Sequence, residues 1–188
     1  HGGSHNDFIN YGHWITEDLP RLRAYEEYHA NTGRKPALLI KKDPPSWMTD
    51  MLQLLGFSPS DWIEWDGTEA TVSRLVIPKL SYVHSVGAEF QPADRAWVSR
   101  EMKSRIEMEE TEQFPERVFI SRQGQERRKI LNFDEMMDVL STFGFEAIRP
   151  EELSIEDQIR LFDQAETIVG ASGSGLASIV FSDAASLI

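Results

Sequence analysis

The sequence predicts an α/β protein with two Rossmann-like domains, of which the second holds a doubly wound parallel sheet. Residues 118–188 alternate between short apolar runs and helical patterns in the order β-α-β-α-β-α-β, which is typical of such a sheet. Residues 10–108 also mix helical patterns with short apolar runs. An acidic, polar stretch at residues 109–113, followed by Pro115, separates the two halves. We place a linker there and expect domains at residues 1–112 and 113–188.

Helices and short strands are mixed in the first domain. A helical pattern begins at Asn10, and Pro20 starts a second helix because proline is tolerated at the first helical position. Ser46 is expected to cap a further helix. The expected helices after the first are 20–30, 46–55 and 92–108, and the expected strands are 37–40, 62–65 and 71–77.

The second domain alternates more regularly. Its expected strands are 118–120, 145–148 and 167–169, with a further strand starting at Leu187. Asn132 and Ser154 are expected to cap the helices at 133–143 and 155–165, and a short helix runs to Phe181. Because the last residues look like the start of a strand, we expect the chain to be a piece of a longer protein.

Composition narrows the range of partners. The net charge of −12 argues against a protein that binds nucleic acids in general or that binds anionic membranes. The chain has no cysteine, which excludes disulfides and thiolate metal sites. No apolar run approaches the roughly 20 residues that span a bilayer, and no signal peptide is visible. We therefore expect a cytoplasmic protein, and leave peripheral association with a membrane open.

A glycine-rich turn, residues 170–175, lies between the third strand of this domain and the helix after it. Because Gly170, Gly173 and Gly175 have no Cβ, the backbone there can adopt positive φ and let another group come close. The start of a helix presents backbone N–H groups that suit a phosphate. The alternative is an ordinary βα turn, since glycine clusters are common in turns.

A basic segment, residues 117–130, follows the first strand of the same domain. It contains Arg117, Arg122, Arg127, Arg128 and Lys129 against the single acid Glu126. It leaves the sheet at the edge where such folds bind ligands, and arginine makes bidentate contacts with phosphate. Arg122, Arg128 and the helix start after Gly175 would together hold a diphosphate, which points to a nucleotide donor. The alternative is a solvated loop.

His13 and Glu17 are spaced i, i+4, and Asp18 adjoins them. On one helix face, such a pair suits a general base that deprotonates a sugar hydroxyl. The alternative is an ion pair on a helix surface. No cluster of residues stands out as a metal site, and Glu64-Trp65-Asp66 is better explained as an exposed strand end.

Four motifs in order resemble glycosyltransferase family 61, which includes capsular polysaccharide biosynthesis proteins. Asn10-Tyr-Gly-His-Trp-Ile-Thr-Glu-Asp-Leu-Pro20 is similar to the family's Asn-x-x-His-Trp-x-x-Glu-x-Leu-Pro block. Ser121-Arg122 with Arg128-Lys-Ile-Leu-Asn132 resembles its Ser-Arg and Arg-x-Ile-x-Asn pair. Residues 144–158 continue the likeness, and the glycine turn completes it. The resemblance covers most of the chain, from about Asn10 to the end.

The resemblance implies a GT-B fold and the inverting transfer of a sugar from a nucleotide-sugar, with no metal and no cofactor. It implies a donor bound mainly by the second domain and an acceptor on the side of the first. His13 and Glu17 correspond to the base candidates, and Arg122, Arg128 and Asn132 to the donor diphosphate region. The donor-binding residues of the turn would be Ser172, Gly173, Ser174 and Gly175.

The turn departs from the family pattern at two positions. Ser172 stands where the family usually has histidine, and Ser178 where it has asparagine. Serine donates one hydrogen bond but carries no charge. This motivates a second reading, a non-catalytic nucleotide-sugar-binding or scaffold protein on the same fold. A third reading, a dinucleotide-binding oxidoreductase, rests on the spacing of Gly170, Gly173 and Gly175, although its usual acidic residue about 20 positions further on is missing.

Overall fold

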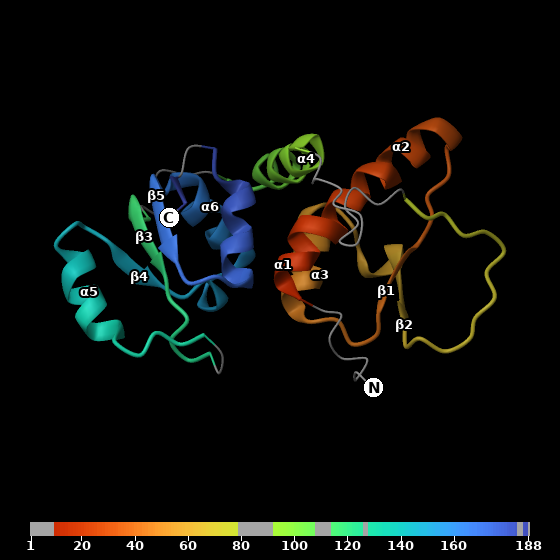
Figure 1. Cartoon of the computed structure of the whole chain (residues 1–188). Helices are drawn as coiled ribbons and strands as arrows, with labels where there is room; N and C mark the ends of the chain where they lie inside the picture. Colours follow the sequence, from red (N-terminus) through yellow and green to blue (C-terminus); the bar gives the residue numbers. More distant parts are fainter. Residues whose placement is uncertain (1–9, 79–91, 108–113, 126–127, 184–185, 188) are drawn as a thin grey trace. The chain divides into compact units, whose positions relative to one another are not determined.

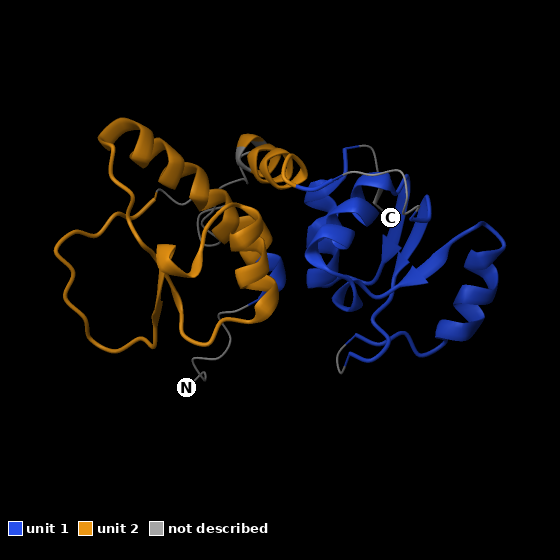
Figure 2. Ribbon diagram, turned by 180° about the vertical axis from the view of Figure 1, so that it is seen from behind, with its two compact units in different colours: residues 1–13, 106–188 blue, residues 14–105 orange. Residues whose placement is uncertain are grey.

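The computed structural model describes residues 10–78, 92–107, 114–125, 128–183 and 186–187. The chain divides into two compact units, coloured in Figure 2. Unit 1 comprises residues 1–13 and 106–188, and unit 2 comprises residues 14–105. The chain therefore leaves unit 1 after His13 and returns to it at Ile106. The linker expected at residues 109–113 lies outside the described residues.

Unit 1 contains a four-stranded sheet in which every pairing is parallel (Figure 1). Its strands are β3 (Arg117–Ile120), β4 (Glu146–Ile148), β5 (Thr167–Gly170) and β6 (Ser186–Leu187), in the order β4-β3-β5-β6. This confirms the predicted parallel sheet. The strand order reverses at β3, since β4 lies on one side of it and β5 on the other. Ligands of parallel α/β sheets bind at such a switch point, beyond the carboxyl ends of the strands.

Two α-helices and two 3-10 helices accompany this sheet: α5 (Phe133–Ser141), η4 (Pro150–Glu152), α6 (Ile155–Gln164) and η5 (Ser174–Phe181). Ser154 caps α6 as predicted, because its Oγ accepts a hydrogen bond from the Asp157 backbone N–H at 3.0 Å. Asn132 precedes α5, but its side chain makes no capping hydrogen bond, so that part of the prediction is wrong. Gly144, at φ 79°, follows α5.

The core of unit 1 lies between the central strands and α6. Val118, Ile120 and Ile168 are almost fully buried on β3 and β5. Ile159 and Phe162 are buried on one side of α6, and Phe181 is buried at the end of η5. Burying apolar surface contributes roughly 25 cal/mol per Å², so this cluster holds the carboxyl ends of β3 and β5 in fixed positions.

Unit 2 contains a second, smaller parallel sheet. Its strands β1 (Leu38–Lys41) and β2 (Trp62–Trp65) match the predicted runs, and Leu38 pairs with Trp62. Its helices are the π-helix η1 (Trp14–Asp18), the 3-10 helices η2 (Leu19–Arg21) and η3 (Pro59–Asp61), and the α-helices α2 (Leu22–Thr32), α3 (Ser46–Leu54) and α4 (Pro92–Lys103). No helix in the described part of the chain is long and apolar enough to span a bilayer.

Three expectations for unit 2 are wrong. Residues 71–77 form no strand, and Ile77 is 76% exposed, so their β-branched composition has no described partner strand or core to stabilise a ladder. Ser46 is the first residue of α3 and not its cap, because the extended Pro45 precedes it. The helix α4 ends at Lys103, short of the expected Met108.

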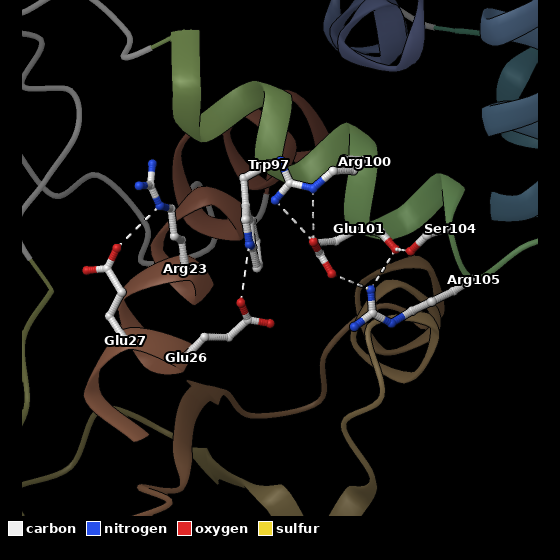
Figure 3. A network of polar contacts seen from close by, with 8 residues as sticks. All are labelled: Arg23, Glu26, Glu27, Trp97, Arg100, Glu101, Ser104 and Arg105. Carbon is white, nitrogen blue, oxygen red and sulfur yellow. Dashed lines mark hydrogen bonds and ion pairs between the residues drawn. The ribbon is translucent and has the colours of Figure 1, made fainter. Parts of the chain in front are cut away.

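A polar network ties α4 to α2 within unit 2 (Figure 3). The indole Nε1 of the buried Trp97 donates to Glu26 Oε2 at 3.3 Å. Glu101 accepts hydrogen bonds from Arg105 and Arg100, and these contacts, that of Arg105 first, lower the pKa of its carboxyl. The network fixes the last turn of α4 just before the chain returns to unit 1.

Candidate active site

The candidate site lies at the switch point of the unit 1 sheet. Ile120, the last residue of β3, pairs with Gly170 of β5 on one side and with Ile148 of β4 on the other. All three strands therefore end at the same level. The basic segment leaves the sheet at Ser121, which is buried and donates its backbone N–H to Ile148 O at 2.8 Å. The glycine turn begins on the neighbouring strand.

Glycine is needed in this turn because another group comes close to the backbone, and not because the backbone has unusual angles. None of Gly170, Gly173 and Gly175 has a φ in the left-handed region, and Gly173 is extended at φ 174°, so the turn does not use this freedom of glycine. A Cβ at Gly173 would instead lie 2.0 Å from Nη1 of Arg122. A side chain there would occupy the place of the guanidinium, so glycine at 173 admits Arg122 to the turn.

Arg128 approaches the same turn from the other end of the basic segment. Its Nη1 donates to the carbonyl oxygen of Ser172 at 2.9 Å, and its backbone has the unusual φ of 59°. The side chain of Ser172 itself is exposed. Arg122 and Arg128 are both distant from the turn in sequence. They nevertheless contact it at neighbouring positions, since the structure brings Arg122 to Gly173 and Arg128 to Ser172.

Other residues of the basic segment lie elsewhere. Arg117 begins β3 at the opposite edge of the sheet, where its Nη1 donates to Phe143 O at 2.6 Å. Lys129 and Asn132 are exposed before α5. Arg127 lies outside the described residues. The positive charge of the segment is therefore divided between the two sheet edges, and Arg122 and Arg128 supply the part that contacts the glycine turn.

Ser174 and Gly175 begin the 3-10 helix η5, which takes the place of the expected helix. The single-turn helix α1 (Tyr11–His13) lies against this start. A Cβ at Gly12 would be 3.4 Å from both Cα and Cβ of Ser174, so the two backbones nearly touch. His13, the candidate base, follows Gly12 directly and belongs to unit 1 with the glycine turn.

Asn10 also contributes to the site as a helix cap, a role that was not among the expectations from the sequence. Its Oδ1 accepts hydrogen bonds from the backbone N–H groups of Gly12 at 2.8 Å and His13 at 3.2 Å. These are the contacts of an N-cap, which satisfies N–H groups at a helix start. An asparagine just before a helical pattern is a recognised signal for this role. Asn10 therefore fixes the backbone of the turn that carries His13.

The acidic candidates lie in unit 2, on the π-helix η1. Asp18 forms an ion pair with Arg21, with 3.1 Å between Oδ1 and Nη1. A π-helix has a wider turn than an α-helix, so the i, i+4 rule for regular helices does not apply along Trp14–Asp18. The pairing of His13 with Glu17 stays a prediction.

A buried polar cluster fastens α1 to the rest of unit 1. The hydroxyl of Tyr11 donates to Gln158 Oε1 at 2.6 Å and lies 2.9 Å from Ser178 Oγ. Gln158 is 5% exposed and Ser178 is completely buried. Burial raises the pKa of Tyr11 to about 12, against a smaller opposing effect of the Ser178 hydrogen bond. The hydroxyl therefore stays protonated at neutral pH and remains a donor.

A parallel sheet with arginines and a glycine turn at its switch point is typical of α/β proteins that bind phosphate-bearing ligands. The Glycosyltransferase 61 family model matches residues 11–188, almost the whole chain. The chain therefore belongs to glycosyltransferase family 61. No curated protein matches it. Family membership favours sugar transfer over the dinucleotide oxidoreductase reading.

Proposed function

We propose that the protein transfers a sugar from a nucleotide-sugar donor to a hydroxyl group of a glycan or other acceptor, with inversion at the anomeric carbon. In this proposal residues 113–188 form a Rossmann-like donor domain and residues 1–112 the acceptor side of a GT-B enzyme. The product belongs to a surface polysaccharide such as a capsule, and the protein works in the cytoplasm. The family likeness supports the sugar transfer, the inversion, the GT-B arrangement and the polysaccharide product, whereas the domain bounds rest on the acidic stretch at residues 109–113 and the cytoplasmic location on composition.

The observation that carries the proposal is the meeting of Arg122 and Arg128 at the glycine turn. Arg122 fits against Gly173, and Arg128 donates to the carbonyl oxygen of Ser172. A guanidinium has five N–H donors in a fork that matches phosphate oxygens, and Arg128 directs one of them at Ser172. Two permanent positive charges beside the start of η5 are well suited to the two phosphates of a nucleoside diphosphate.

The proposed reaction follows from these charges. A base removes the proton of the acceptor hydroxyl, and the acceptor oxygen forms a bond to the anomeric carbon. The bond from that carbon to the donor phosphate oxygen breaks, and the electron pair leaves with the nucleoside diphosphate. Arg122, Arg128 and the backbone N–H groups at Ser174 and Gly175 stabilise the growing charge. We assign Asn132 to the same diphosphate region only because it matches the asparagine of the family's Arg-x-Ile-x-Asn pattern.

The base is proposed to be His13 or Glu17, with Asp18 as a third candidate. The neutral imidazole of histidine accepts protons near neutral pH, which suits this role. His13 is also the candidate on the unit that contains the glycine turn. Asp18 already holds Arg21 in an ion pair, which makes it the weakest of the three.

Arginine substitutions test the proposal. Arg122→Ala and Arg128→Ala should each cost about 2 to 4 kcal/mol of transition-state stabilisation, the usual loss for one such donor. Arg117→Ala, which removes the same charge at the opposite sheet edge, is the matched control. Transfer and donor hydrolysis are measured with a panel of nucleotide-sugars, and nucleotide binding by calorimetry. Unchanged turnover and nucleotide binding in both site variants would overturn the assignment.

One specific feature favours a second candidate function, a non-catalytic nucleotide-sugar-binding or scaffold protein. Ser172 replaces the histidine expected from the family pattern, and a serine cannot supply that positive charge. Calorimetry that shows nucleotide binding, together with no transfer from any donor in the panel, would favour this alternative.

A further inference from the structure

The N-terminal helical turn belongs to the unit that contains the glycine turn, although most of the first hundred residues do not. Residues 1–13 cluster with residues 106–188, and the chain enters unit 2 only at Trp14. The helical turn α1 (Tyr11–His13) runs directly into η1 (Trp14–Asp18) of unit 2, so it is the first turn of a longer helical stretch. Its place in unit 1 must therefore depend on contacts to the rest of that unit.

Tyr11 supplies the hydrogen bonds that hold it there. Its hydroxyl reaches Gln158 on α6 and Ser178 on η5, which are 147 and 167 positions away in sequence. Gln158 donates its own Nε2 to Leu153 O at 3.3 Å, which fixes the orientation of its amide so that Oε1 faces Tyr11.

The direction of each hydrogen bond follows from this. The amide oxygen of Gln158 only accepts, so the single proton of Tyr11 goes to it. Ser178 must then donate its proton to the oxygen of Tyr11. A hydrogen bond donated to that oxygen favours the ionised phenol, in agreement with the lowering effect of Ser178 on the Tyr11 pKa. The three side chains thus form a directed chain of partly buried hydrogen bonds, in which the side chains of Gln158 and Ser178 are themselves buried.

We infer that Tyr11, Gln158 and Ser178 form a latch that holds the helical turn Tyr11–His13 on η5, and that Tyr11 is thereby a positioning residue for the proposed sugar transfer. The latch places Gly12 against Ser174, the residue of the glycine turn at which η5 begins. His13 is the next residue, with its backbone N–H held by Asn10. The catalytic part of this inference rests on the proposed function, whereas the latch itself does not.

The latch has a clear consequence for how the site is assembled. The candidate base His13 is carried by the unit that holds Arg122 and Arg128, and not by the remainder of the N-terminal half. Donor binding and the backbone of the base would therefore share one rigid framework, built from η5 and α6. Loosening the latch would misplace the base without removing any group proposed to contact the diphosphate.

Tyr11→Phe tests the inference, because it removes one hydroxyl and keeps the ring. Ser178→Ala removes the second partner, and Tyr28→Phe on α2 of unit 2 is the matched control. Hydrogen exchange of the full chain is followed for the amides of Gly12 and His13. We expect about a tenfold loss of protection in Tyr11→Phe and Ser178→Ala, no further loss in the double variant, and none in Tyr28→Phe.

Steady-state kinetics and nucleotide binding then distinguish misplacement of the candidate base from a loss of donor binding. Tyr11→Phe is expected to lower kcat about tenfold or more, while the Kd of a nucleoside diphosphate changes less than about threefold. Unchanged protection of Gly12 and His13 in Tyr11→Phe would overturn the latch. Lost protection with wild-type kcat would overturn the positioning role. Protection that depends on Tyr11 in a protein that transfers no sugar would support the latch and overturn the proposed function instead.

Discussion

The guanidinium of Arg122 occupies the space that a side chain of Gly173 would fill. Only 2.0 Å would separate Arg122 Nη1 from a Cβ on Gly173, less than any real carbon contact allows. The two residues belong to the loops after β3 and β5, which pair in parallel and end level. The absence of a side chain at position 173 is therefore part of how the arginine reaches the turn.

Gly173→Ala should displace Arg122 and lower the affinity for nucleoside diphosphate by about tenfold or more, as expected when one charge-assisted contact is lost. Stability should change by less than about 1 kcal/mol, because the end of a flexible side chain can move aside and the extended backbone at Gly173 accepts alanine. Calorimetry with the diphosphate and urea unfolding measure the two quantities.

Gly175→Ala is the comparison for this variant. Its new methyl group would meet Ile120 Cγ2 at 3.5 Å and Pro150 Cγ at 3.9 Å, which are ordinary contacts. We therefore expect a smaller loss of affinity than in Gly173→Ala. Equal losses of affinity in the two variants would contradict the prediction, because they would show that glycine at 173 is not required for the placement of Arg122.

Ser172→His should strengthen diphosphate binding by several-fold, since the position is exposed and its carbonyl oxygen already receives Arg128. The gain should be larger near pH 6 than near pH 8, because an imidazole with a pKa of about 6.5 is charged only at the lower pH. Ser172→Gln, which adds length without charge, is the control. A gain that is equal at both pH values, or no gain, would argue for a structural role of the turn.

Transfer should continue at full rate in excess EDTA. The reason is that two arginines at the glycine turn supply the positive charge that a bound cation provides in other transferases. Adding Mg²⁺ or Mn²⁺ back should then change kcat by less than about twofold. A loss of activity in EDTA that either cation restores would contradict the proposed metal-independent mechanism.

Tyr11 should make the protein sensitive to alkali. Its pKa is about 12 in the folded state, above the ordinary tyrosine value of 10.0, so the folded state holds this proton more tightly. The associated stability is fully present below pH 10 and is lost as the pH rises toward 12, by about 3 kcal/mol in all. Urea unfolding at a series of pH values should show this loss in full in the wild type and in Tyr28→Phe. The loss should be smaller in Tyr11→Phe, where burial of Tyr25, with the nearby Asp61, still raises the pKa of that tyrosine. A parallel pH dependence of wild type and Tyr11→Phe would contradict the assignment.

Ser154→Ala should destabilise unit 1 by about 1 kcal/mol, the usual cost of losing an N-cap. The Ser154 hydroxyl accepts from the Asp157 backbone N–H at 3.0 Å, whereas Asn132 makes no such bond to α5. Asn132→Ala should therefore cost less than about 0.5 kcal/mol in the same unfolding measurement. Equal costs would mean that the difference in capping geometry has no energetic consequence.

Much of the local structure could be predicted because it follows from short-range patterns. The apolar runs at 118–120 and 167–169 became β3 and β5, and Ser154 capped α6. The failures also have local causes. Residues 71–77 have a strand composition but no described partner strand, and Asn132 has the residue type of a cap without its hydrogen bond.

Sequence patterns were enough to predict the alternation of strands and helices, the family, and the arrival of the basic segment and the glycine turn at one sheet edge. That edge is predictable because the carboxyl ends of parallel strands meet there. The folded structure was needed to find that glycine at 173 makes room for Arg122, and that Tyr11 binds Gln158 and Ser178. These contacts join residues far apart in the chain, and their geometry depends on how the buried core fixes β3, β5 and α6, which no local pattern encodes.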